Sequence, residues 1–286
     1  MLGRRPEPGD DITADHKERF KPVSDVAIFD TQAVRRHRNR AASHPGPDGL
    51  GRVSAVLDDL GERLLDRLND TSASFASVLE IGGRGSIAAK LQARGMQVVS
   101  ADFSAPMAAC AGGLAVAIDG EALPFGPQKF DLVLAHCSLH WINDLPGALI
   151  QLRRALRPGG LFLASMPVLG TLQELRAALL DAELMLTGGV SPRVSPYPDL
   201  RDCAGLLQRA GFLLPVADVE EIALLYANPL GLLLELRAAG ETNAVAARSR
   251  KIPSRELFPL ALSNLPMREN RTVATLKLAI MTGWAT

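Results

Sequence analysis

The sequence predicts an α/β fold with a doubly wound, mostly parallel sheet, and three observations support this prediction. From Phe75 onward, short apolar runs typical of buried strands alternate with helical segments. The run Val78-Leu79-Glu80-Ile81 leads directly into the glycine turn Gly82-Gly83-Arg84-Gly85, as where a strand passes into a helix. The next apolar run ends at Asp102, so an acidic residue stands at a second strand end.

The expected elements follow one another in the order that this fold requires. A helix over 53–68 carries its leucines on one face and is expected to lie on the sheet. Strands are expected near 76–81, 97–101, 114–118, 130–135 and 160–166, with helices between them at 84–94, 104–111 and 144–157. The second half predicts helices over 171–186 and 199–210, a strand over 216–226, a helical region over 229–264 and a last strand over 273–281. The two late strands are expected to form an antiparallel edge of the sheet.

The composition changes once, near the N-terminus. Residues 1–25 are polar and charged, and we expect them to be disordered. Residues 26–286 are expected to form one domain that begins with a short helix ending near Arg40. Helical insertions at about 170–210 and 228–268 interrupt the strand pattern and are expected to form a lid.

Charge and cysteine content narrow the class of protein. The chain has 31 acidic and 31 basic residues, which argues against a sequence-independent grip on nucleic acid. It offers no long apolar segment for a membrane span and no apolar core of a secretory signal. Three cysteines lie scattered without paired spacing, so we expect a reducing compartment and a cytoplasmic protein.

Acidic residues follow three successive strands and indicate a nucleoside pocket. Glu80, Asp102 and Asp119 stand at the ends of the first, second and third expected strands. A carboxylate after the second strand can accept both hydroxyls of a ribose, and glycines let the backbone approach a ligand closely. Two alternatives remain open: the glycines form only a tight turn, and Asp102 caps the helix that follows it.

These residues resemble those of the class I S-adenosylmethionine-dependent methyltransferases, over about Phe75 to Met166. The resemblance implies a Rossmann-like sheet of seven strands with the last one antiparallel. It also implies that Glu80 lies near the methionine amino group, Asp102 at the ribose and Asp119 at the adenine of S-adenosylmethionine. The expected cofactor-binding residues are Glu80, Gly82, Gly83, Gly85, Asp102, Phe103, Asp119, Gly120, Glu121 and His136. The methyl acceptor is expected near Ser138, His140 and Met166.

A narrower resemblance covers nearly the whole chain. It rests on Ile28-Phe29-Asp30 with Arg35-Arg36-His37-Arg38, and on the segments 138–146, 191–196, 206–212, 240–243 and 282–284. These segments resemble bacterial relatives of a mitochondrial respiratory complex I assembly factor, which is described as hydroxylating an arginine of a complex I subunit. The malonyl-carrier-protein methyltransferase of biotin synthesis is a more distant relative with the same Leu139-His140-Trp141 region.

One departure from the family pattern concerns the glycine turn. The family turn reads acidic-x-Gly-x-Gly-x-Gly, whereas Glu80-Ile81-Gly82-Gly83-Arg84-Gly85 is one residue shorter. Either the glycines absorb the deletion, or cofactor affinity falls and the protein is a scaffold with a degenerate site. The prediction is therefore a methyltransferase of unknown acceptor. The alternatives are an assembly factor that modifies an arginine of a complex I subunit and a non-catalytic scaffold.

Several polar residues have two interpretations. His140 is either a proton acceptor or a packing residue, and His136 either lines the cofactor pocket or is buried and neutral. The basic run from Arg35 to Arg40 is either a solvated helix face or a cover over the pocket. No clustered metal ligands and no two-histidine-one-carboxylate set can be placed, so no metal site is expected.

Overall fold

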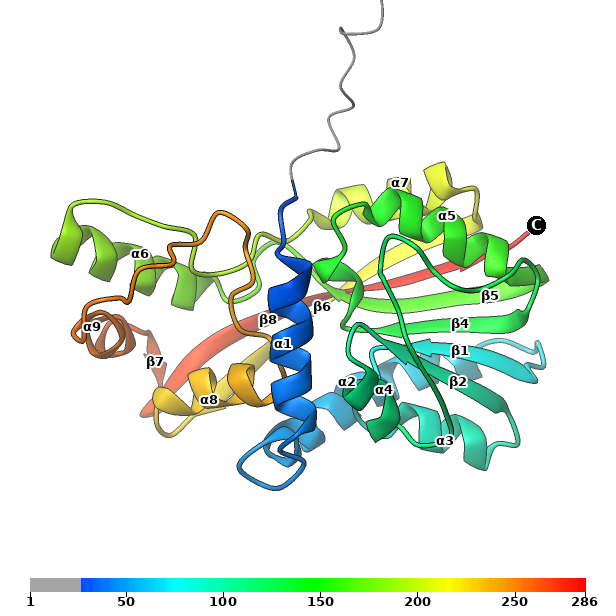
Figure 1. The fold of residues 1–286 in the computed structure, drawn as a ribbon, viewed down its shortest axis with the longest axis horizontal. Helices are drawn as coiled ribbons and strands as arrows, with labels where there is room; N and C mark the ends of the chain where they lie inside the picture. The colour runs from blue at the N-terminus through cyan, green and yellow to red at the C-terminus, as the bar shows by residue number, and fades with distance from the viewer. Residues whose placement is uncertain (1–26) are drawn as a thin grey trace, which may run out of the picture.

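The computed structural model, which describes residues 27–286, contains one sheet in which seven strands follow one another and an eighth, short strand pairs at the side (Figure 1). Their order across the sheet is β3-β2-β1-β4-β5-β8-β6, and the two-residue strand β7 pairs with β8 off this path. The bounds are β1 Ser77–Ile81, β2 Gln97–Asp102, β3 Leu114–Ala117, β4 Phe130–His136, β5 Leu156–Pro167, β6 Leu213–Tyr226, β7 Met267–Arg268 and β8 Arg271–Trp284.

The pairing confirms the predicted sheet. Strands β1 to β5 pair in parallel, and β8 runs antiparallel to both β5 and β6. The strand order reverses at β1, which lies between β2 and β4, with Glu80 opposite Ser100 on one side and Leu134 on the other. In an open parallel sheet such a reversal leaves a crevice at the carboxyl ends of the strands. The expected acidic residues therefore stand where a crevice can form.

Helices cover both faces of the sheet. On one face, α2 (Ser54–Asn69) and α3 (Ile87–Ala93) bury Leu64 and Leu91 against β1 and β4. On the other face, α5 (Leu145–Ala155) and α7 (Leu200–Ala210) bury the leucines of their inner sides. Each fully buried leucine contributes about 2 kcal/mol of hydrophobic free energy. The apolar stripe expected over 53–68 is thus a core-facing surface.

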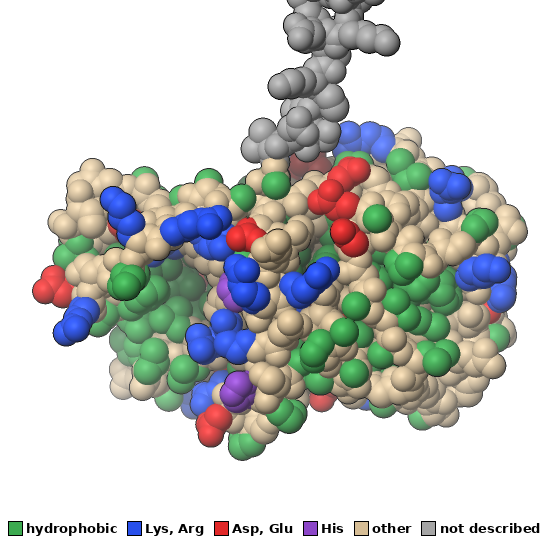
Figure 2. Space-filling view, in the orientation of Figure 1, with side chains coloured by type: hydrophobic (Ala, Val, Ile, Leu, Met, Phe, Trp, Pro, Cys, Tyr) green, Lys and Arg blue, Asp and Glu red, His purple; other side chains and the backbone are tan. Residues whose placement is uncertain are grey.

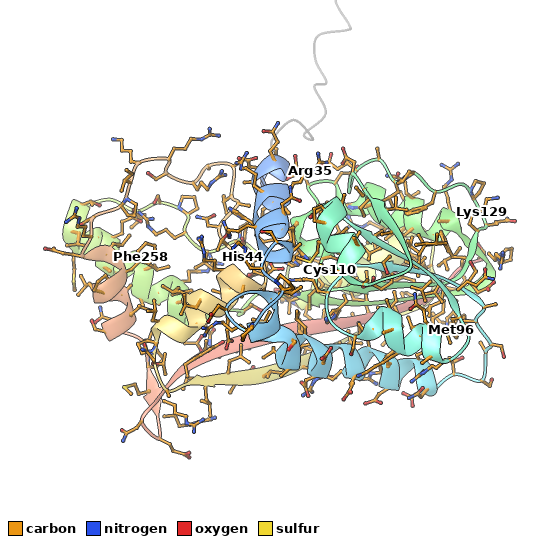
Figure 3. All side chains as sticks on the ribbon, turned by 60° about the horizontal axis from the view of Figure 1, so that its bottom comes forward. Arg35, His44, Met96, Cys110, Lys129 and Phe258 are labelled. Carbon is orange, nitrogen blue, oxygen red and sulfur yellow. The ribbon has the colours of Figure 1, made fainter. Side chains whose placement is uncertain are left out.

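A third apolar cluster lies beyond the carboxyl ends of β1 and β4. It joins α6 (Gln173–Thr187), α8 (Leu230–Ala238) and α9 (Leu257–Ser263) to Tyr226 and Ala274 at the far ends of β6 and β8. Figure 3 shows these helices at one end of the molecule, with Phe258 there, and Met96 and Lys129 at the other end. We call these three helices the lid. The insertion expected at about 170–210 holds α6, which is part of the lid, and α7, which packs on the sheet beside α5.

Helix α1 (Thr31–Ala42) stands across the crevice edge and packs against α4 (Ala105–Cys110). Asp30 caps α1, accepting a hydrogen bond from the amide of Ala33 at 2.9 Å. Its carboxylate also pairs with Arg248 at 2.8 Å, and Phe29 bridges to Val245. The entry to α1 is thereby tied to the loop after α8.

Several element boundaries differ from the predictions. Helix α3 begins at Ile87 instead of 84, because Gly82, Gly83 and Gly85 adopt positive φ angles that a right-handed helix excludes. Strand β5 begins at Leu156 instead of 160, directly after α5. The helical region expected over 229–264 is two helices separated by the irregular segment 239–256. The segment expected to be disordered, 1–25, lies outside the described residues.

None of the helices within residues 27–286 combines the length and the apolar character needed to cross a membrane.

Candidate functional site

The glycine turn after β1 is packed tightly against the protein's own backbone. A Cβ added to Gly82, at φ +133°, would stand 2.5 Å from the carbonyl oxygen of His136. A Cβ on Gly83 would stand 2.9 Å from the carbonyl oxygen of Met107, and one on Gly85 would meet Asp58 at 3.2 Å. These glycines are required because strand β4 and helices α2 and α4 approach the turn closely.

The two carboxylates at the ends of β1 and β2 are both buried. Glu80 Oε1 accepts a hydrogen bond from the amide of Gly83 at 3.1 Å, whereas Oε2 has no partner among the described residues. Burial raises the pKa of Glu80 to about 7. Asp102 Oδ1 accepts from the amide of Ser104 at 2.9 Å, and Ser104 itself caps α4 through the amide of Met107. Asp102 is therefore not the helix cap, which was one of its two interpretations.

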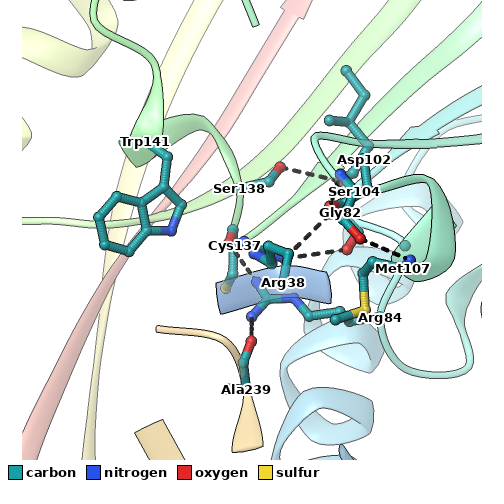
Figure 4. Close-up of polar contacts among 12 residues, drawn as sticks. Arg38, Gly82, Arg84, Asp102, Ser104, Met107, Cys137, Ser138, Trp141 and Ala239 are labelled. Atoms are coloured by element: carbon teal, nitrogen blue, oxygen red, sulfur yellow. Dashed lines mark hydrogen bonds and ion pairs between the residues drawn. The ribbon is translucent and has the colours of Figure 1, made fainter. Parts of the chain in front are cut away.

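Arg38, from α1, fills the space in front of Asp102 (Figure 4). Its side chain is fully buried, and Nη1 lies 3.3 Å from Asp102 Oδ2 and 3.4 Å from the carbonyl oxygen of Gly82. Nη2 donates to the carbonyl oxygen of Cys137 at 3.4 Å and to Glu241 at 3.1 Å. The basic run over 35–40 therefore includes one residue that covers the pocket.

Arg84, within the glycine turn, completes a buried network of charges. Its Nη1 lies 2.7 Å from Glu241 Oε1 and 3.0 Å from the carbonyl oxygen of Ala239, and Nη2 donates to the carbonyl oxygen of Cys137 at 2.5 Å. Arg38 and Arg84 supply two positive charges, and Asp102 and Glu241 supply two negative charges. A network with balanced charges can stay buried, whereas an unpaired charge there would be costly.

A hollow of about 280 Å³ remains on the other side of α1, next to Asp119. It is lined by Arg35, Asn39, Phe103, Ala105, Pro106, Ala117, Ile118 and Asp119. Asp119 is exposed, and its Oδ1 accepts a hydrogen bond from the amide of Glu121 at 3.0 Å. Gly120 packs under Phe103, because a Cβ there would lie 2.7 Å from that ring. Phe103, Asp119 and Gly120 are thus brought together, on the other side of α1 from the buried carboxylates.

The remaining predicted residues lie around β4 and β5. His136 is fully buried with Nδ1 3.1 Å from Ser165 Oγ, and burial lowers its pKa to about 3, so the imidazole is neutral. Ser138 Oγ donates to the carbonyl oxygen of Ile81 at 3.2 Å. Met166 is buried in the sheet core, and Glu121 is exposed at the surface. None of His136, Ser138, Met166 and Glu121 lines one of the cavities described here, whereas His140 does.

His140 lines an apolar cavity of about 110 Å³ between the sheet end and the lid, which we call the inner cavity. Its Nε2 lies 3.0 Å from Glu241 Oε2, and its Nδ1 has no hydrogen-bond partner among residues 27–286. Burial lowers the pKa of His140 despite the adjacent carboxylate, so the ring is neutral near neutral pH. Nε2 then donates to Glu241, which leaves Nδ1 as a free acceptor.

Glu241, in the loop after α8, is the common partner of Arg38, Arg84 and His140. Trp141 Nε1 also donates to its Oε2, at 2.9 Å. Burial alone would raise the pKa of Glu241, but Arg84, His140 and Arg38 together hold it well below its usual range. Glu241 is therefore an anion that orients one neutral histidine and two arginines.

Sequence reasoning considered Arg38 only as part of the basic run over 35–40, and it missed Arg84 and Glu241 as site residues. One signal could have found Arg38, because it shares a helix face with Val34 and Ala41, at spacings of four and three residues. A charged residue on a buried face indicates a buried partner. Arg84 and Glu241 carry no such local signal, because a turn and a loop have no buried face.

Comparison with known proteins identifies the class. Residues 79–164 match the family model described as a methyltransferase domain. The chain is 32% identical over 275 residues to a protein of Danio rerio named arginine-hydroxylase NDUFAF5, mitochondrial, covering 93% of this chain and 85% of the relative. The chain therefore belongs to the class I S-adenosylmethionine-dependent methyltransferases, and it has an S-adenosylmethionine-dependent methyltransferase domain.

Two further relatives place it within that class. The human protein of the same name is 34% identical over 270 residues, covering 90% of this chain and 76% of the relative. A malonyl-[acyl-carrier protein] O-methyltransferase of Xylella fastidiosa is 31% identical over 275 residues, covering 90% of this chain and 89% of the relative. Both similarities extend far beyond the matched domain and include the lid.

Solved structures share the fold at low identity. The YcgJ protein of Bacillus subtilis superposes with a TM-score of 0.54 at 14% identity, covering 78% of this chain and 98% of that one. A protein of Bacillus halodurans gives a TM-score of 0.51 at 14% identity, covering 78% and 99%.

The described arrangement does not fit S-adenosylmethionine at the end where its ribose and methionine are expected. Arg38 pairs with Asp102 Oδ2, the atom expected to bind the ribose. The glycine turn is also closely packed, because a Cβ on Gly82 or Gly83 would stand only 2.5 or 2.9 Å from a backbone oxygen. The hollow beside Phe103 and Asp119 remains open, and Glu80 Oε2 remains unpaired. The residues expected to hold the cofactor are thus present at one edge of the sheet, but Arg38 covers part of them. Among residues 27–286 no group of three or more His, Cys, Asp or Glu side chains is placed to hold a metal ion.

Proposed function

We propose that this chain is a cytoplasmic S-adenosylmethionine-dependent methyltransferase and that the structure describes its closed form. One observation carries the proposal: Glu80, Asp102 and Asp119 stand at or just past the ends of three neighbouring parallel strands. In the open form, Asp102 would bind the ribose, the unpaired Oε2 of Glu80 the methionine amino group, and Asp119 the adenine. The three free cysteines fit the reducing compartment that the proposal assumes.

Opening requires that Arg38 leave Asp102, and α1 is the element that carries it. The entry of α1 is held by Asp30 and Arg248. A ligand that binds only the open form has an apparent affinity reduced by the small population of that form. Cofactor affinity is therefore expected to be weak in the native chain and to rise when Arg38 is removed.

The inner cavity lies next to this site, and we propose that it holds the methyl acceptor. His140 lines it, and the carboxylate of Glu241 fixes the tautomer in which Nδ1 is a free proton acceptor. We propose His140 as the residue that would take a proton from an acceptor in this cavity. Ser138 and Met166 would support the site from behind, since both are buried.

Calorimetric titration with S-adenosylhomocysteine tests the proposal on the wild type, Arg38→Met and Arg36→Met. The Arg38→Met variant is expected to bind at least about tenfold more tightly, because the ligand no longer displaces a guanidinium from Asp102. Arg36 is the matched control on the same helix, since its side chain is 62% exposed and its carboxylate neighbour is 4.0 Å away. Circular dichroism and thermal melting check that both variants fold.

A second variant keeps the test decisive if Arg38→Met is unstable. Insertion of one glycine between Gly82 and Gly83 restores the family's turn length and should also raise the affinity. Absence of heat for the wild type and both altered chains at millimolar ligand would contradict the methyltransferase proposal.

A non-catalytic scaffold is the second candidate, and the buried network favours it. Arg38, Arg84, Asp102 and Glu241 satisfy one another without a ligand, which a protein that never binds cofactor would also do. The calorimetric failure described above is the outcome that this candidate predicts.

A third candidate modifies an arginine of a partner protein, which the family resemblance implies to be a respiratory complex I subunit. The inner cavity favours it, because Glu235, Tyr197 and Tyr226 all line that cavity. Carboxylates and aromatic rings are the groups that bind guanidinium. Mass spectrometry of a co-expressed subunit would distinguish an added methyl group from an added oxygen atom.

A further inference from the structure

A second and larger cavity opens beside the inner cavity and has a different character. It measures about 530 Å³ and lies between α6, α8, α9 and the loop that follows α8, and we call it the lid cavity. Its walls are formed by Leu172, Leu175, Leu179, Leu230, Leu233, Leu236 and Phe258. Figure 2 shows this hollow of hydrophobic side chains to the left of α1, with basic side chains along its border. Its volume is that of pockets that enclose small organic molecules.

The border of the lid cavity carries two arginines without a carboxylate. Arg237 lines the cavity, and Arg40 donates to Thr242 Oγ1, another lining residue, at 3.1 Å. Neither arginine forms an ion pair with any of residues 27–286. Arg193, the third arginine there, is already paired with Glu183 at 2.5 Å.

Neighbouring groups show that this border is electropositive. Burial, followed by the charge of Arg237, lowers the pKa of Arg40. Burial, together with Arg40 and nearby arginines, lowers the pKa of His37 to about 4, and its Nδ1 has no partner among the described residues. Cations crowded at a partly dry border favour an anion there, and guanidinium groups bind carboxylates with directed hydrogen bonds.

The inner end of the lid cavity holds a carboxylate whose cationic partners are already in place. Glu241 lines both cavities and is held as an anion by Arg84, His140 and Arg38. An anionic ligand would therefore be oriented with its charge at the border and its apolar part among the leucines.

We propose that the lid cavity binds an aliphatic carboxylate, with its chain between α6 and α8 and its carboxylate at Arg40 and Arg237. The binding does not depend on methyl transfer, so it can fail or hold independently of the proposed function. A chain buried in this cavity contributes by removal of apolar surface from water, and the arginines select for charge.

Calorimetric titration of the full chain with dodecanoate, dodecanol and acetate tests this proposal without cofactor. Dodecanoate is expected to bind at least about tenfold more tightly than dodecanol, because a hydrogen bond to a charged group contributes more than 1.4 kcal/mol. Acetate, which lacks the chain, is expected to show no measurable heat. Equal affinity for dodecanoate and dodecanol, or no binding of dodecanoate, would overturn the proposal.

Three variants locate the ligand. Arg237→Gln should weaken dodecanoate about tenfold and leave dodecanol unchanged. Phe258→Ala should weaken both, since it removes part of the apolar wall. Arg201→Gln is the matched control, because Arg201 is 88% exposed on α7 and pairs only with Asp199 among the described carboxylates. An Arg237→Gln variant that binds dodecanoate as the wild type does would place the ligand elsewhere.

The chain itself supplies one competing occupant. Residues 1–26 include the acidic side chains Glu7, Asp10, Asp11 and Asp15. Dodecanoate binding that occurs only after these four are replaced by their amides would overturn the proposal in favour of this segment.

Discussion

At the scale of single residues, the site is defined by charges that face one another away from water. Arg38 and Asp102 are both fully buried at 3.3 Å, and Arg84 lies 2.7 Å from Glu241. A buried pair is not a large source of stability by itself, but loss of one partner leaves a charge without compensation. The network therefore constrains which substitutions the site tolerates.

Arg84→Ala should lower the free energy of unfolding by about 3–5 kcal/mol, because Glu241 would lose its shortest ion pair. Arg67→Ala is the matched control, since Arg67 and Asp218 form a pair at the surface, with side chains 40% and 52% exposed. The control should cost no more than about 1 kcal/mol. Urea unfolding measures both variants. Equal losses of unfolding free energy would show that the buried ion pair contributes no more than the surface pair.

Glu80 should make stability depend on pH. Its pKa is raised from 4.5 to about 7, so the folded state binds a proton more tightly than the unfolded state. The resulting stabilisation is fully present below pH 4.5 and is lost as the pH rises through about 7, an effect of order 3 kcal/mol. Urea unfolding between about pH 5 and pH 8 should show this loss in the wild type relative to Glu80→Gln. Parallel pH profiles for the two chains would contradict it.

At the scale of elements, α1 is the helix that covers the crevice. The helix carries Arg38 into the crevice, and its first residues are tied to the loop after α8 by Asp30, Arg248 and the bridge between Phe29 and Val245. The loop between α8 and α9 also carries Glu241. A change at the entry of α1 can therefore loosen the cover without touching the carboxylates beneath it.

Asp30→Ala should loosen α1 specifically. It removes the helix cap and the partner of Arg248, at a cost of about 0.5–2 kcal/mol for the cap. Amide hydrogen exchange followed by mass spectrometry should quicken in residues 31–42. Asp199→Ala removes the cap of α7 in the same way and should quicken exchange there instead. Unchanged exchange in α1 would show that other contacts hold the helix.

At the scale of the whole molecule, one sheet supports three large apolar clusters with different roles. The clusters on the two sheet faces hold β1 to β5 between α2, α3, α5 and α7. The lid cluster forms part of the wall of both cavities and contacts the sheet through the far ends of β6 and β8. We therefore expect the clusters on the sheet faces to provide most of the stability and the lid cluster to control ligand access.

Leu134→Ala, in the centre of the sheet, should lower the free energy of unfolding by about 2–5 kcal/mol, since this side chain is completely buried. Leu184→Ala on the outer side of α6 is the matched control, because its side chain is 52% exposed. The control should remain within about 0.5 kcal/mol of the wild type. Denaturant titration compares them, and similar midpoints would mean that the sheet centre is not the core.

The sequence by itself determined the succession of strands and helices along the chain, the carboxylates at the strand ends and the class of protein. Local patterns carry this information, because a buried strand needs an apolar run and a tight turn needs glycine. The helix over 53–68, the five parallel strands and the late antiparallel pair were all predictable on that basis. The family resemblance added the seven-stranded sheet.

Only the tertiary structure decided what stands in front of the carboxylates. Arg38, Arg84 and Glu241 come from three segments far apart in the chain, and no local pattern relates them. They meet because α1 crosses the crevice and the loop after α8 returns to it, which places two guanidinium groups on one carboxylate away from water. Burial then sets their charge states, and a charge that is buried must find its partner wherever the fold brings one.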